Sequence, residues 1–305
     1  MKTTKKPQPL EAVQIKKTIP GEKIKMTIIL NDDQKREISQ MIGDLQAHKS
    51  KYFLFDSFIK VDNDALNVAH ALLNNDYKTF KKYKLKYTKH TAEKMRGIDS
   101  LSTYKKYSDV CKFLQHGGGI CSKCYADKSI SLYKAALLPT LIYNTLLLKY
   151  IDIDADQIPY INSKYFRFES FSDLQSSKHF KNLLTICKKN KCCLFTLWSK
   201  CGYKLTKYME AEKILKLPNN LNIVFSEYYI NKKTEINYLK QLQACLYPQQ
   251  AITGNYKNAL KCFVVYDDEK KRKESNLYQC KNSCINCLKC YKKSKNIIYI
   301  AEKIH

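Results

Sequence analysis

Hydrophobic residues between positions 127 and 266 fall into short apolar runs that alternate with longer amphipathic stretches. Four short apolar runs predict strands, at 165–170, 192–197, 222–225 and 261–266. Four longer stretches predict helices, at 127–150, 176–189, 203–216 and 234–244. Strands that alternate with helices of this length favour βαβ units and therefore a parallel sheet. The pattern predicts an α/β fold, built either as a partial (βα) barrel or as an open parallel sheet.

The first part of the chain has a different pattern. Residues 1–24 are basic and contain three prolines, which predicts a flexible arm. An apolar run at 25–30 predicts a short strand, and Asn31 after it is a good helix N-cap. Helices are predicted at 33–48 and 64–90.

The second of these predicted helices contains a stretch, at 77–90, in which aromatic residues alternate with lysines. The favoured interpretation is an amphipathic helix with a solvated lysine face. The alternative is a surface on which the bases of single-stranded nucleic acid stack.

These patterns divide the 305 residues into four segments. The segments are a flexible arm (1–24), a mostly helical region (25–110), an α/β core that opens with a cysteine motif (111–268) and a cysteine-rich, metal-binding C-terminal segment (269–305). The length is sufficient for one large domain or two of ordinary size.

The net charge of +26 at neutral pH makes a nucleic acid or a nucleotide a candidate partner. Only four of the 54 basic residues are arginine, however, and arginine is the usual choice for bidentate recognition of phosphates and bases. The positive charge is also spread along the chain. We therefore expect contact with an anionic ligand rather than recognition of a nucleic-acid sequence.

No apolar run reaches the roughly 20 residues that a membrane-spanning helix needs. The longest, at 135–148, is interrupted by Pro139, and the N-terminus lacks the apolar segment of a secretory signal. These features predict a cytoplasmic protein without a membrane partner. In that reducing compartment, clustered cysteines are metal ligands or catalytic groups rather than disulfides.

Seven of the 13 cysteines form two groups. The upstream group has the spacing C-x9-C-x2-C and consists of Cys111, Cys121 and Cys124. The downstream group has the spacing C-x3-C-x2-C-x2-C and consists of Cys280, Cys284, Cys287 and Cys290. The other six lie in helix or strand patterns and are predicted core residues, namely Cys187, Cys192, Cys193, Cys201, Cys245 and Cys262.

Three thiolates leave one coordination position of a metal open, as a catalytic site requires, so the upstream group predicts a reactive centre. With His116 as a fourth ligand, the same group would instead hold a structural zinc. The four downstream thiolates make a closed site. Their compact spacing is closer to that of ferredoxin-type 4Fe–4S clusters than to the separated knuckles of zinc ribbons. An iron–sulfur cluster is therefore the favoured cofactor, and zinc is the alternative.

Polar residues follow the predicted core strands, at the edge where parallel α/β proteins place their working residues. Any polar loop would account for part of this pattern. Carboxylates and one lysine predict catalytic residues, namely Glu169, Asp173, Lys200 and Glu227. One arginine and two hydroxyls predict cofactor-binding residues, namely Arg167, Ser170 and Ser226. Strand alternation places Arg167 on the same face as Glu169, which predicts either an ion pair between them or an anion site.

Several short motifs occur in a defined order across roughly residues 95–290. They are SLST, ICSKCYA, FRFESFSDL, FTLWSK, NIVFSE and the terminal four-cysteine run. In this order they resemble the gene-product-88-like family of bacteriophages and mobile elements. The resemblance implies a cysteine motif before an arginine-bearing strand, a C-terminal cysteine cluster and a location in the cytoplasm of a bacterial host. The chain departs from the family pattern where FESFSD replaces a Gly-Asp turn.

A looser similarity is to radical S-adenosylmethionine (SAM) enzymes, which combine a partial βα barrel with a three-cysteine cluster. Many of these enzymes carry a second, fully ligated cluster near the C-terminus, and the two cysteine groups here follow the same order. The similarity implies SAM as a cofactor. The C-x3-C-x2-C spacing of those enzymes occurs here at Cys280, Cys284 and Cys287, after the strands rather than before them.

Two functions are consistent with these features. The first is an iron–sulfur enzyme of radical-SAM-like architecture with a reactive upstream group and a structural or electron-transferring downstream group. Its substrate would be a nucleotide, a nucleic acid or another anionic molecule. The second is a basic nucleic-acid-binding or interaction protein without catalysis, in which zinc stabilises the loops beside the sheet. A metal-free redox pair at Cys121 and Cys124 is a third interpretation, but it leaves the downstream group unexplained.

Overall fold

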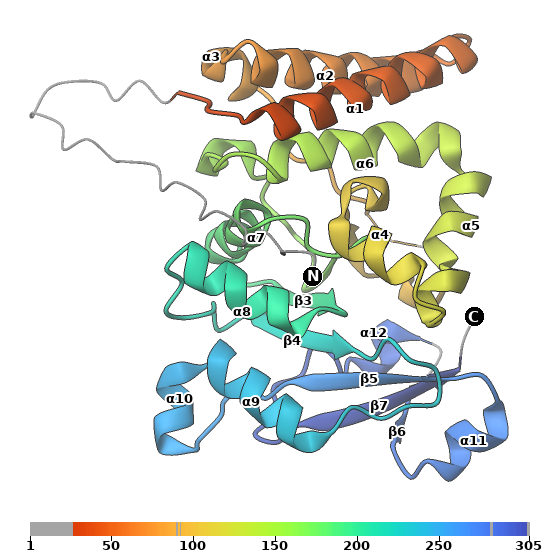
Figure 1. Ribbon diagram of the computed structural model, residues 1–305, viewed down its shortest axis with the longest axis vertical. Coiled ribbons are helices and arrows are strands. Elements are labelled where there is room, and N and C mark those ends of the chain that lie inside the picture. Colours follow the sequence, from red (N-terminus) through yellow and green to blue (C-terminus); the bar gives the residue numbers. More distant parts are fainter. Residues whose placement is uncertain (1–26, 90, 92, 281–282, 304–305) are drawn as a thin grey trace, which may run out of the picture.

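A single parallel sheet organises the part of the chain that the structure describes. The computed structural model describes residues 27–303 except 90, 92 and 281–282 (Figure 1). The strands stand in the order β1-β2-β3-β4-β5-β7-β6, and every neighbouring pair is parallel. Their bounds are Asp99–Leu101 (β1), Tyr165–Phe168 (β2), Leu194–Ser199 (β3), Leu221–Ser226 (β4), Lys261–Tyr266 (β5), Tyr278–Gln279 (β6) and Ile298–Lys303 (β7). Because β1 and β6 lie at opposite edges, this sheet is open, and the barrel alternative is not supported.

One face of the sheet packs against the helices that link the core strands. α7 (Ser177–Lys189), α8 (Gly202–Ala211) and α9 (Ile236–Leu246) each connect two consecutive strands between β2 and β5. Right-handed crossovers place connections that advance in one direction on the same side of a sheet. Alternate strand residues are buried on this side, and the rings of Phe168 and Phe195 stack with centroids 5.0 Å apart. The predicted core strands correspond to β2 to β5, and three predicted helices correspond to α7 to α9.

The predicted helix at 127–150 is divided into two. α5 (Tyr125–Leu132) and α6 (Lys134–Leu148) follow each other with a sharp bend, and α6 is buried along most of its length. No single helix in the described chain is long and apolar enough to cross a membrane. Only the bent pair Ile120–Leu132 and Lys134–Leu148, which meet at 110°, passes that test by length and composition.

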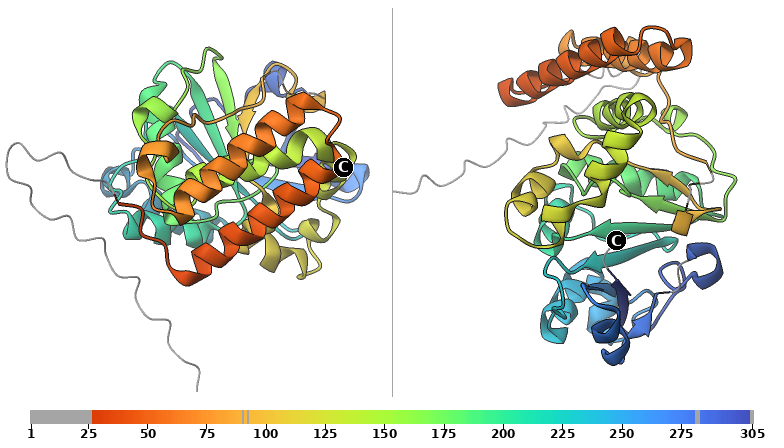
Figure 2. Two further views of the ribbon diagram at one scale, coloured as in Figure 1. Left: turned by 90° about the horizontal axis from the view of Figure 1, so that it is seen from above. Right: turned by 90° about the vertical axis from the view of Figure 1, so that its right-hand side faces the viewer.

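An outer helical layer covers α6 on its side away from the sheet (Figure 2). It consists of α1 (Asp32–Lys51) and α2 (Asp56–Leu73). α1 begins at Asn31, whose side chain accepts a 2.8 Å hydrogen bond from the Gln34 N–H, while the Gln34 side chain accepts one from the Asn31 N–H. The predicted N-cap is therefore confirmed as a capping box.

Two predictions for the N-terminal region need correction. Residues 27–30 of the predicted strand at 25–30 are not a strand, and residues 25–26 lie outside the described chain, as does the predicted arm at 1–24. The predicted helix at 64–90 ends early, because after α2 only α3 (Tyr77–Phe80) is helical. The aromatic residues of 77–90 turn inward: Phe80 is buried, and the Tyr87 ring packs 5.5 Å from that of Phe166. They therefore do not form a stacking surface.

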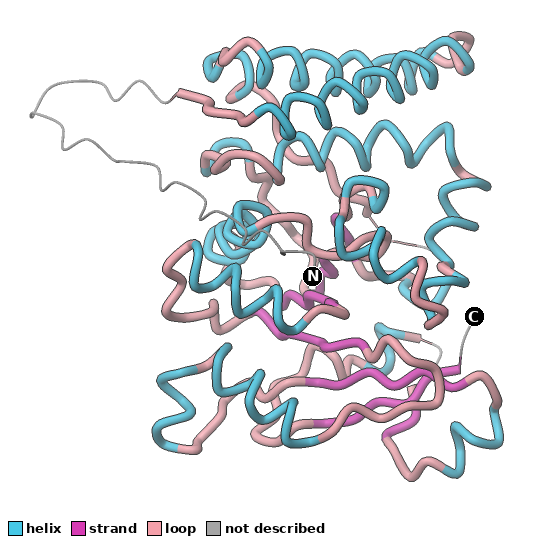
Figure 3. The backbone as a smooth tube through the Cα atoms, viewed as in Figure 1, coloured by secondary structure: helices cyan, strands magenta, loops and turns pink. Residues whose placement is uncertain are grey.

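The opposite face of the sheet is covered by the connection from β6 to β7. The chain passes from β5 through α11 (Glu269–Glu274) to the edge strand β6 and then returns to β7, between β5 and β6. Because the direction along the sheet reverses, a right-handed connection must use the other face. The returning segment is mostly loop and contains one helical turn, α12 (Cys284–Cys287) (Figure 3). The downstream cysteines thus lie against the sheet, whose strands β1, β6 and β7 come from the predicted N-terminal and C-terminal segments.

The remaining helices are short. They are α4 (Asp109–Gln115), α10 (Pro248–Thr253) and the 3-10 turns η1 (Glu93–Met95), η2 (Lys105–Tyr107), η3 (Ile120–Lys123) and η4 (Ala155–Gln157). Three of them, η2, α4 and η3, lead into α5. Cys111 lies in α4, Cys121 in η3 and Cys124 at the N-cap of α5, so these elements position the first candidate site.

Candidate functional site

The downstream cysteines sit on the sheet face opposite α7 to α9. Cys280 follows β6, and its N–H donates a 2.8 Å hydrogen bond to the Ala301 carbonyl of β7. α12 then carries Cys284 and Cys287, and Leu288 takes a left-handed conformation with a φ of 52° before the chain reaches Cys290. Cys280 and Cys290 both pack against an apolar cluster formed by Val224, Phe263, Val265 and Ile300. The sheet therefore provides a floor for this group.

Arg167 projects from β2 on the same face as the downstream cysteines. Its guanidinium lies 4.3 Å from the ring centroid of Trp198, and its Nη1 is 3.3 Å from the Met95 sulfur. The described chain gives its buried Nε no hydrogen-bond partner and its guanidinium no carboxylate. Burial raises the pKa of Cys284, and the charges of Lys94 and Arg167 partly offset that rise. The cations on this face are therefore close enough to interact with the thiols.

A second cation on this face, Lys261, lies at the start of β5 and, unlike the half-buried Arg167, is fully buried. Its side chain is 0% exposed, and its ammonium donates a 3.2 Å hydrogen bond to the Asn222 side chain. Burial lowers the pKa of Lys261 to about 8, and the nearby thiol of Cys290 opposes that change. No carboxylate within the described residues pairs with it. The sequence did not indicate that Lys261 would be buried beside a cysteine, because it is simply the first residue of an apolar strand.

The upstream cysteines are carried by α4, η3 and α5, beyond the carboxyl ends of β2 and β3. Tyr228, which follows β4, anchors the glycine loop between α4 and η3. Its hydroxyl donates to the Leu114 carbonyl at 2.8 Å and accepts from the Gly119 N–H at 3.0 Å, while its own carbonyl accepts from the Ile120 N–H at 3.0 Å. A Cβ on Gly119 would lie 2.6 Å from the carbonyl oxygen and a ring carbon of Tyr228. Glycine is therefore required for this close approach.

A Gly119→Ala variant is expected to lose about 1–3 kcal/mol of stability, because the added methyl group cannot avoid the Tyr228 backbone. Denaturant unfolding of the two proteins measures this loss. Gly43→Ala in α1 is the matched control: a Cβ added there would have no atom within 4 Å, so the change should be neutral or stabilising. Equal stability of Gly119→Ala and the wild type would show that the loop does not depend on Tyr228.

Asp173 and Lys200 come together beside the upstream cysteines. The buried carboxylate of Asp173 accepts hydrogen bonds from the backbone N–H groups of Lys200 at 2.8 Å and Leu174 at 2.7 Å. Burial raises the pKa of Cys111 to about 12, and the charge of Asp173 adds to this rise. Burial alone would lower the pKa of Lys200, but the negative charges of Cys121 and Asp173 outweigh it and the net pKa is raised. The structure thus gathers two thiols, one carboxylate and one ammonium.

Cys124 and His116 are the remaining predicted ligands of the upstream group. Cys124 is the N-cap residue of α5 and interacts electrostatically with Cys121. His116 ends α4 and is exposed. Burial raises the pKa of Cys121, which does not match the low thiol pKa that a Cys-x-x-Cys redox pair requires.

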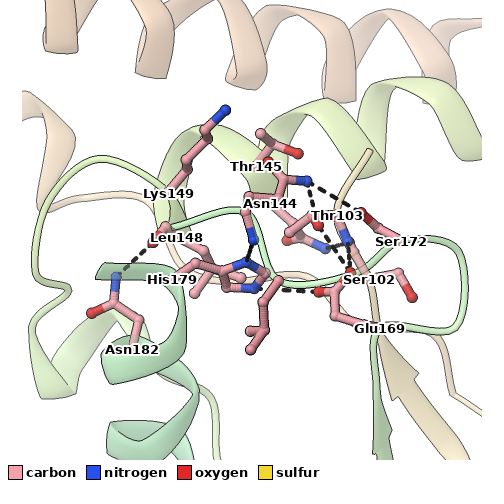
Figure 4. A network of polar contacts seen from close by, with 12 residues as sticks. Ser102, Thr103, Asn144, Thr145, Leu148, Lys149, Glu169, Ser172, His179 and Asn182 are labelled. Carbon is pink, nitrogen blue, oxygen red and sulfur yellow. Dashed lines mark hydrogen bonds and ion pairs between the residues drawn. The ribbon is translucent and has the colours of Figure 1, made fainter. Parts of the chain in front are cut away.

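The polar residue after β2 does not join the upstream site. Glu169 has a φ of 55°, which breaks the strand alternation and turns its side chain away from Arg167. Its carboxylate accepts a 2.9 Å hydrogen bond from the Thr103 hydroxyl and lies 3.3 Å from Nε2 of His179 (Figure 4). The predicted pairing of Arg167 with Glu169 is therefore wrong. Ser170 is buried nearby, and its carbonyl accepts a hydrogen bond from the Tyr125 hydroxyl.

The Glu227 carboxylate is also hydrogen-bonded to residues close to it in the chain. Its carboxylate accepts hydrogen bonds from the N–H groups of Tyr228 at 2.9 Å and Tyr229 at 3.2 Å, and from the Thr234 hydroxyl. Ser226 is buried at the end of β4. These contacts make Glu227 a loop-holding residue, and its predicted catalytic role stays a prediction without structural support.

Sequence reasoning missed the buried residues around Glu169. Gln175 donates a 2.6 Å hydrogen bond from its side chain to the Thr103 hydroxyl, and its backbone N–H donates to Nδ1 of His179 at 3.3 Å. Both side chains come from positions without a motif. Only the burial of Gln175 and His179 in a polar network identifies them, and Figure 4 shows His179 beside Glu169.

The thiols do not form a ready-made ligand set. Among the described residues, no three His, Cys, Asp or Glu side chains are arranged to hold a metal ion as they stand. Metal binding would therefore have to draw the thiols together, as occurs where binding is coupled to local folding. Of the predicted core cysteines, Cys187, Cys193 and Cys262 are buried and Cys201 is half-buried, whereas Cys192 and Cys245 are exposed and that prediction is wrong for them.

The fold and the two cysteine groups define an open, all-parallel α/β protein with thiols at the carboxyl edge and across one face of its sheet. A family model described as Gene product 88 matches residues 70–293, and the chain belongs to this family. The match begins within α2, so α1 lies outside it. No curated protein and no solved structure matches the chain. The looser similarity to radical SAM enzymes is not shown by these comparisons.

Proposed function

We propose that this protein is a phage-type metalloprotein whose downstream cysteines hold an iron–sulfur cluster. The observation that carries the proposal is the pair of cations, Arg167 and Lys261, that face these thiols without a carboxylate partner in the described chain. Buried charges are normally paired, because an unpaired charge in a low-dielectric interior is costly. Thiols that coordinate a metal are deprotonated, so a four-thiolate centre would carry the missing negative charge.

The donor set fits such a centre in number and in chemistry. Cys280, Cys284, Cys287 and Cys290 supply four thiolates, the full set for a 4Fe–4S cluster. A zinc ion bound by the same four thiolates would also be net negative, and it remains the alternative occupant. The cluster, when bound, would supply electron transfer. The protein's contribution is the apolar floor beneath the thiols and the positive charge of Arg167 and Lys261.

The upstream group is proposed as the reactive centre. Cys111, Cys121 and Cys124 would supply three ligands to a second cluster and leave one position for substrate or SAM. Lys200 is held beside these thiols by Asp173, whose carboxylate is fixed by two backbone N–H groups. Its ammonium is thereby placed to bind an anionic substrate and to donate a proton to it. The negative charges of Cys121 and Asp173 raise the pKa of that ammonium and so keep it charged.

Composition of the purified protein tests the proposal. The full-length chain, purified without oxygen, is expected to be brown, to absorb near 400 nm and to contain iron and acid-labile sulfide. Incubation with SAM and a reductant would then test for SAM cleavage. A colourless protein with stoichiometric zinc would exclude the iron–sulfur assignment and leave the zinc-stabilised interaction protein.

Single cysteine variants separate the two groups. Cys284→Ser is expected to lose metal and thermal stability, whereas Cys121→Ser should lose only the upstream metal and any activity. Cys245→Ser, at an exposed position in α9, is the matched control and should change neither. If Cys121→Ser melts as early as Cys284→Ser, the upstream group is structural and the reactive-centre assignment fails.

A further inference from the structure

Aromatic side chains lie exposed on the elements that carry the upstream cysteines. Phe113 in α4 is 79% exposed, Tyr125 in α5 is 47% exposed and Tyr133, between α5 and α6, is 63% exposed. Large aromatic side chains are normally buried to a greater extent, and several on one surface indicate a binding function. The aromatics of 77–90, by contrast, face the core. The exposed aromatics nearest the upstream cysteines therefore lie on α4, at the start of α5 and just before α6.

The same segment is rich in lysine. Residues 104–134 contain six lysines and only two acidic residues, Asp109 and Asp127. Lys123 and Lys128 are exposed near the cysteines, and no ion pair within the described chain neutralises them. The lysines and the exposed aromatics therefore lie in the same segment of the chain.

Four of the lysines line one cavity of about 380 Å³ between η2, α4 and α5. Lys105 and Lys106 are fixed in its wall by ion pairs, to Asp127 at 2.5 Å and to Asp44 at 2.7 Å. Lys112 is only loosely paired, with its ammonium 3.8 Å from Asp109. The fourth, Lys134, is exposed and has no acidic partner in the described chain. The cavity thus combines fixed cations with cations that are available to an anionic ligand.

The cavity also lies next to the upstream thiols. Lys105 in its wall is close enough for its charge to act on Cys121. Gln115, which also lines the cavity, reaches from α4 to Asp127 on α5 and so spans the segment that carries Cys121 and Cys124. A ligand held in the cavity would therefore be near the proposed reactive centre.

We propose that this surface, from η2 to the start of α6, binds single-stranded nucleic acid and presents it to the upstream cysteine group. The lysine-lined cavity takes a backbone phosphate, and unpaired bases stack on Phe113, Tyr125 and Tyr133. Proteins that bind single strands combine a positive groove with aromatic stacking surfaces in this way. Duplex nucleic acid would leave these aromatics unused, because its bases are already stacked on one another. The presentation step rests on the proposed function, whereas the binding step does not.

Fluorescence anisotropy with labelled oligo-dT and oligo-U of about 16 nucleotides tests the binding step. The full-length protein is expected to bind at low salt, to weaken steeply as salt rises and to prefer the single strand to a duplex of equal length. A Phe113→Ala/Tyr133→Ala variant is expected to bind about fivefold or more weakly. A Lys112→Glu/Lys134→Glu variant is expected to bind more weakly and to show a shallower salt dependence.

Matched controls carry the same changes on other surfaces. They are Tyr160→Ala/Tyr203→Ala, which removes two aromatics that are 76% and 66% exposed, and Lys216→Glu/Lys257→Glu, which reverses two exposed lysines. Both should bind as the wild type does. The proposal is overturned if the controls weaken binding as much as the test variants, if the duplex binds better, or if neither oligonucleotide binds. The dT and U arms show whether DNA or RNA is the preferred strand.

The oligonucleotide-binding experiment and the metal analysis can fail independently of each other. Cys121→Ser keeps the lysines and aromatics and is expected to retain oligonucleotide binding. A zinc-containing protein that still binds the oligonucleotide through this surface would refute only the iron–sulfur assignment. A brown protein that ignores the oligonucleotide would refute only the binding surface.

Discussion

A Cys284→Ser/Cys287→Ser double variant is expected to lose its downstream metal and to release the connection between β6 and β7 from the sheet. In the described chain this connection contains one helical turn, the four residues of α12, and β6 pairs with β7 through two residues. Two hydrogen bonds near its end also fix it: the Tyr291 carbonyl accepts from the Asn222 side chain at 2.9 Å, and the Ser294 carbonyl accepts from the Ala259 N–H at 2.7 Å. Without the metal, the remaining thiol of Cys290, whose pKa burial raises to about 12, would be neutral, so Arg167 and Lys261 would lose the negative charge of the centre. Breaking a buried charge pair on one side costs about 3–5 kcal/mol.

Hydrogen–deuterium exchange measures this release directly. Protection is expected to fall in peptides that cover 278–297, whereas β3 and β4 in the middle of the sheet should keep theirs. Cys192→Ser/Cys245→Ser, at two exposed positions, is the matched control and should leave every peptide unchanged. Unchanged protection of 278–297 in the double variant would show that the thiols do not hold this connection.

A third substitution tests the role of the buried cation. In the double variant, Lys261→Met should recover stability, because it removes a buried charge that no longer has a partner. In the wild type, the same substitution should destabilise the metal-bound protein. Similar effects in both backgrounds would mean that Lys261 does not compensate the charge of the thiolates.

The sequence predicted the centre of the sheet but not its edges. β2 to β5 are runs of apolar or alternating residues between amphipathic helices, so local periodicity identifies them. β1 has three residues, Asp99–Leu101, and β6 has two, Tyr278–Gln279, which are too short to show any period. The return of β7 to a position between β5 and β6 depends on contacts between segments distant in the chain. That information is not present in a local pattern.

Local sequence patterns also predicted only part of the candidate site. Cysteine spacing identified both thiol groups, and strand ends identified Asp173 and Lys200, which the structure places together. Strand alternation failed at Glu169, because one residue with a φ of 55° moves its side chain out of the face that alternation assigns. Lys261 could not be predicted, since a lysine at a strand start usually reaches solvent and its burial depends on the segment folded over it.

The correction at Glu169 leads to a second large expected effect. His179 accepts a hydrogen bond from the Gln175 N–H at its Nδ1, so its Nε2 carries the proton; this nitrogen lies 3.3 Å from the Glu169 carboxylate without the geometry of a hydrogen bond. Both side chains are 0% exposed. The same carboxylate accepts from the hydroxyl and N–H of Thr103, at 2.9 and 3.3 Å. It therefore ties the end of β1 to the end of β2 and to α7 (Figure 4).

A Glu169→Ala variant is expected to lose about 1–3 kcal/mol of stability, because it leaves the buried hydroxyl and N–H of Thr103 without their acceptor and removes the carboxylate beside His179. For a protein of this size the melting temperature should fall by on the order of 5 °C. Glu210→Ala, which removes an exposed carboxylate on α8, is the matched control and should change stability by less than about 0.5 kcal/mol. Metal content and oligonucleotide binding of the folded variant should equal those of the wild type, because the Glu169 carboxylate itself contacts no residue of either site. The opposite result, unchanged melting with loss of activity, would restore the catalytic role that the sequence alone indicated for Glu169.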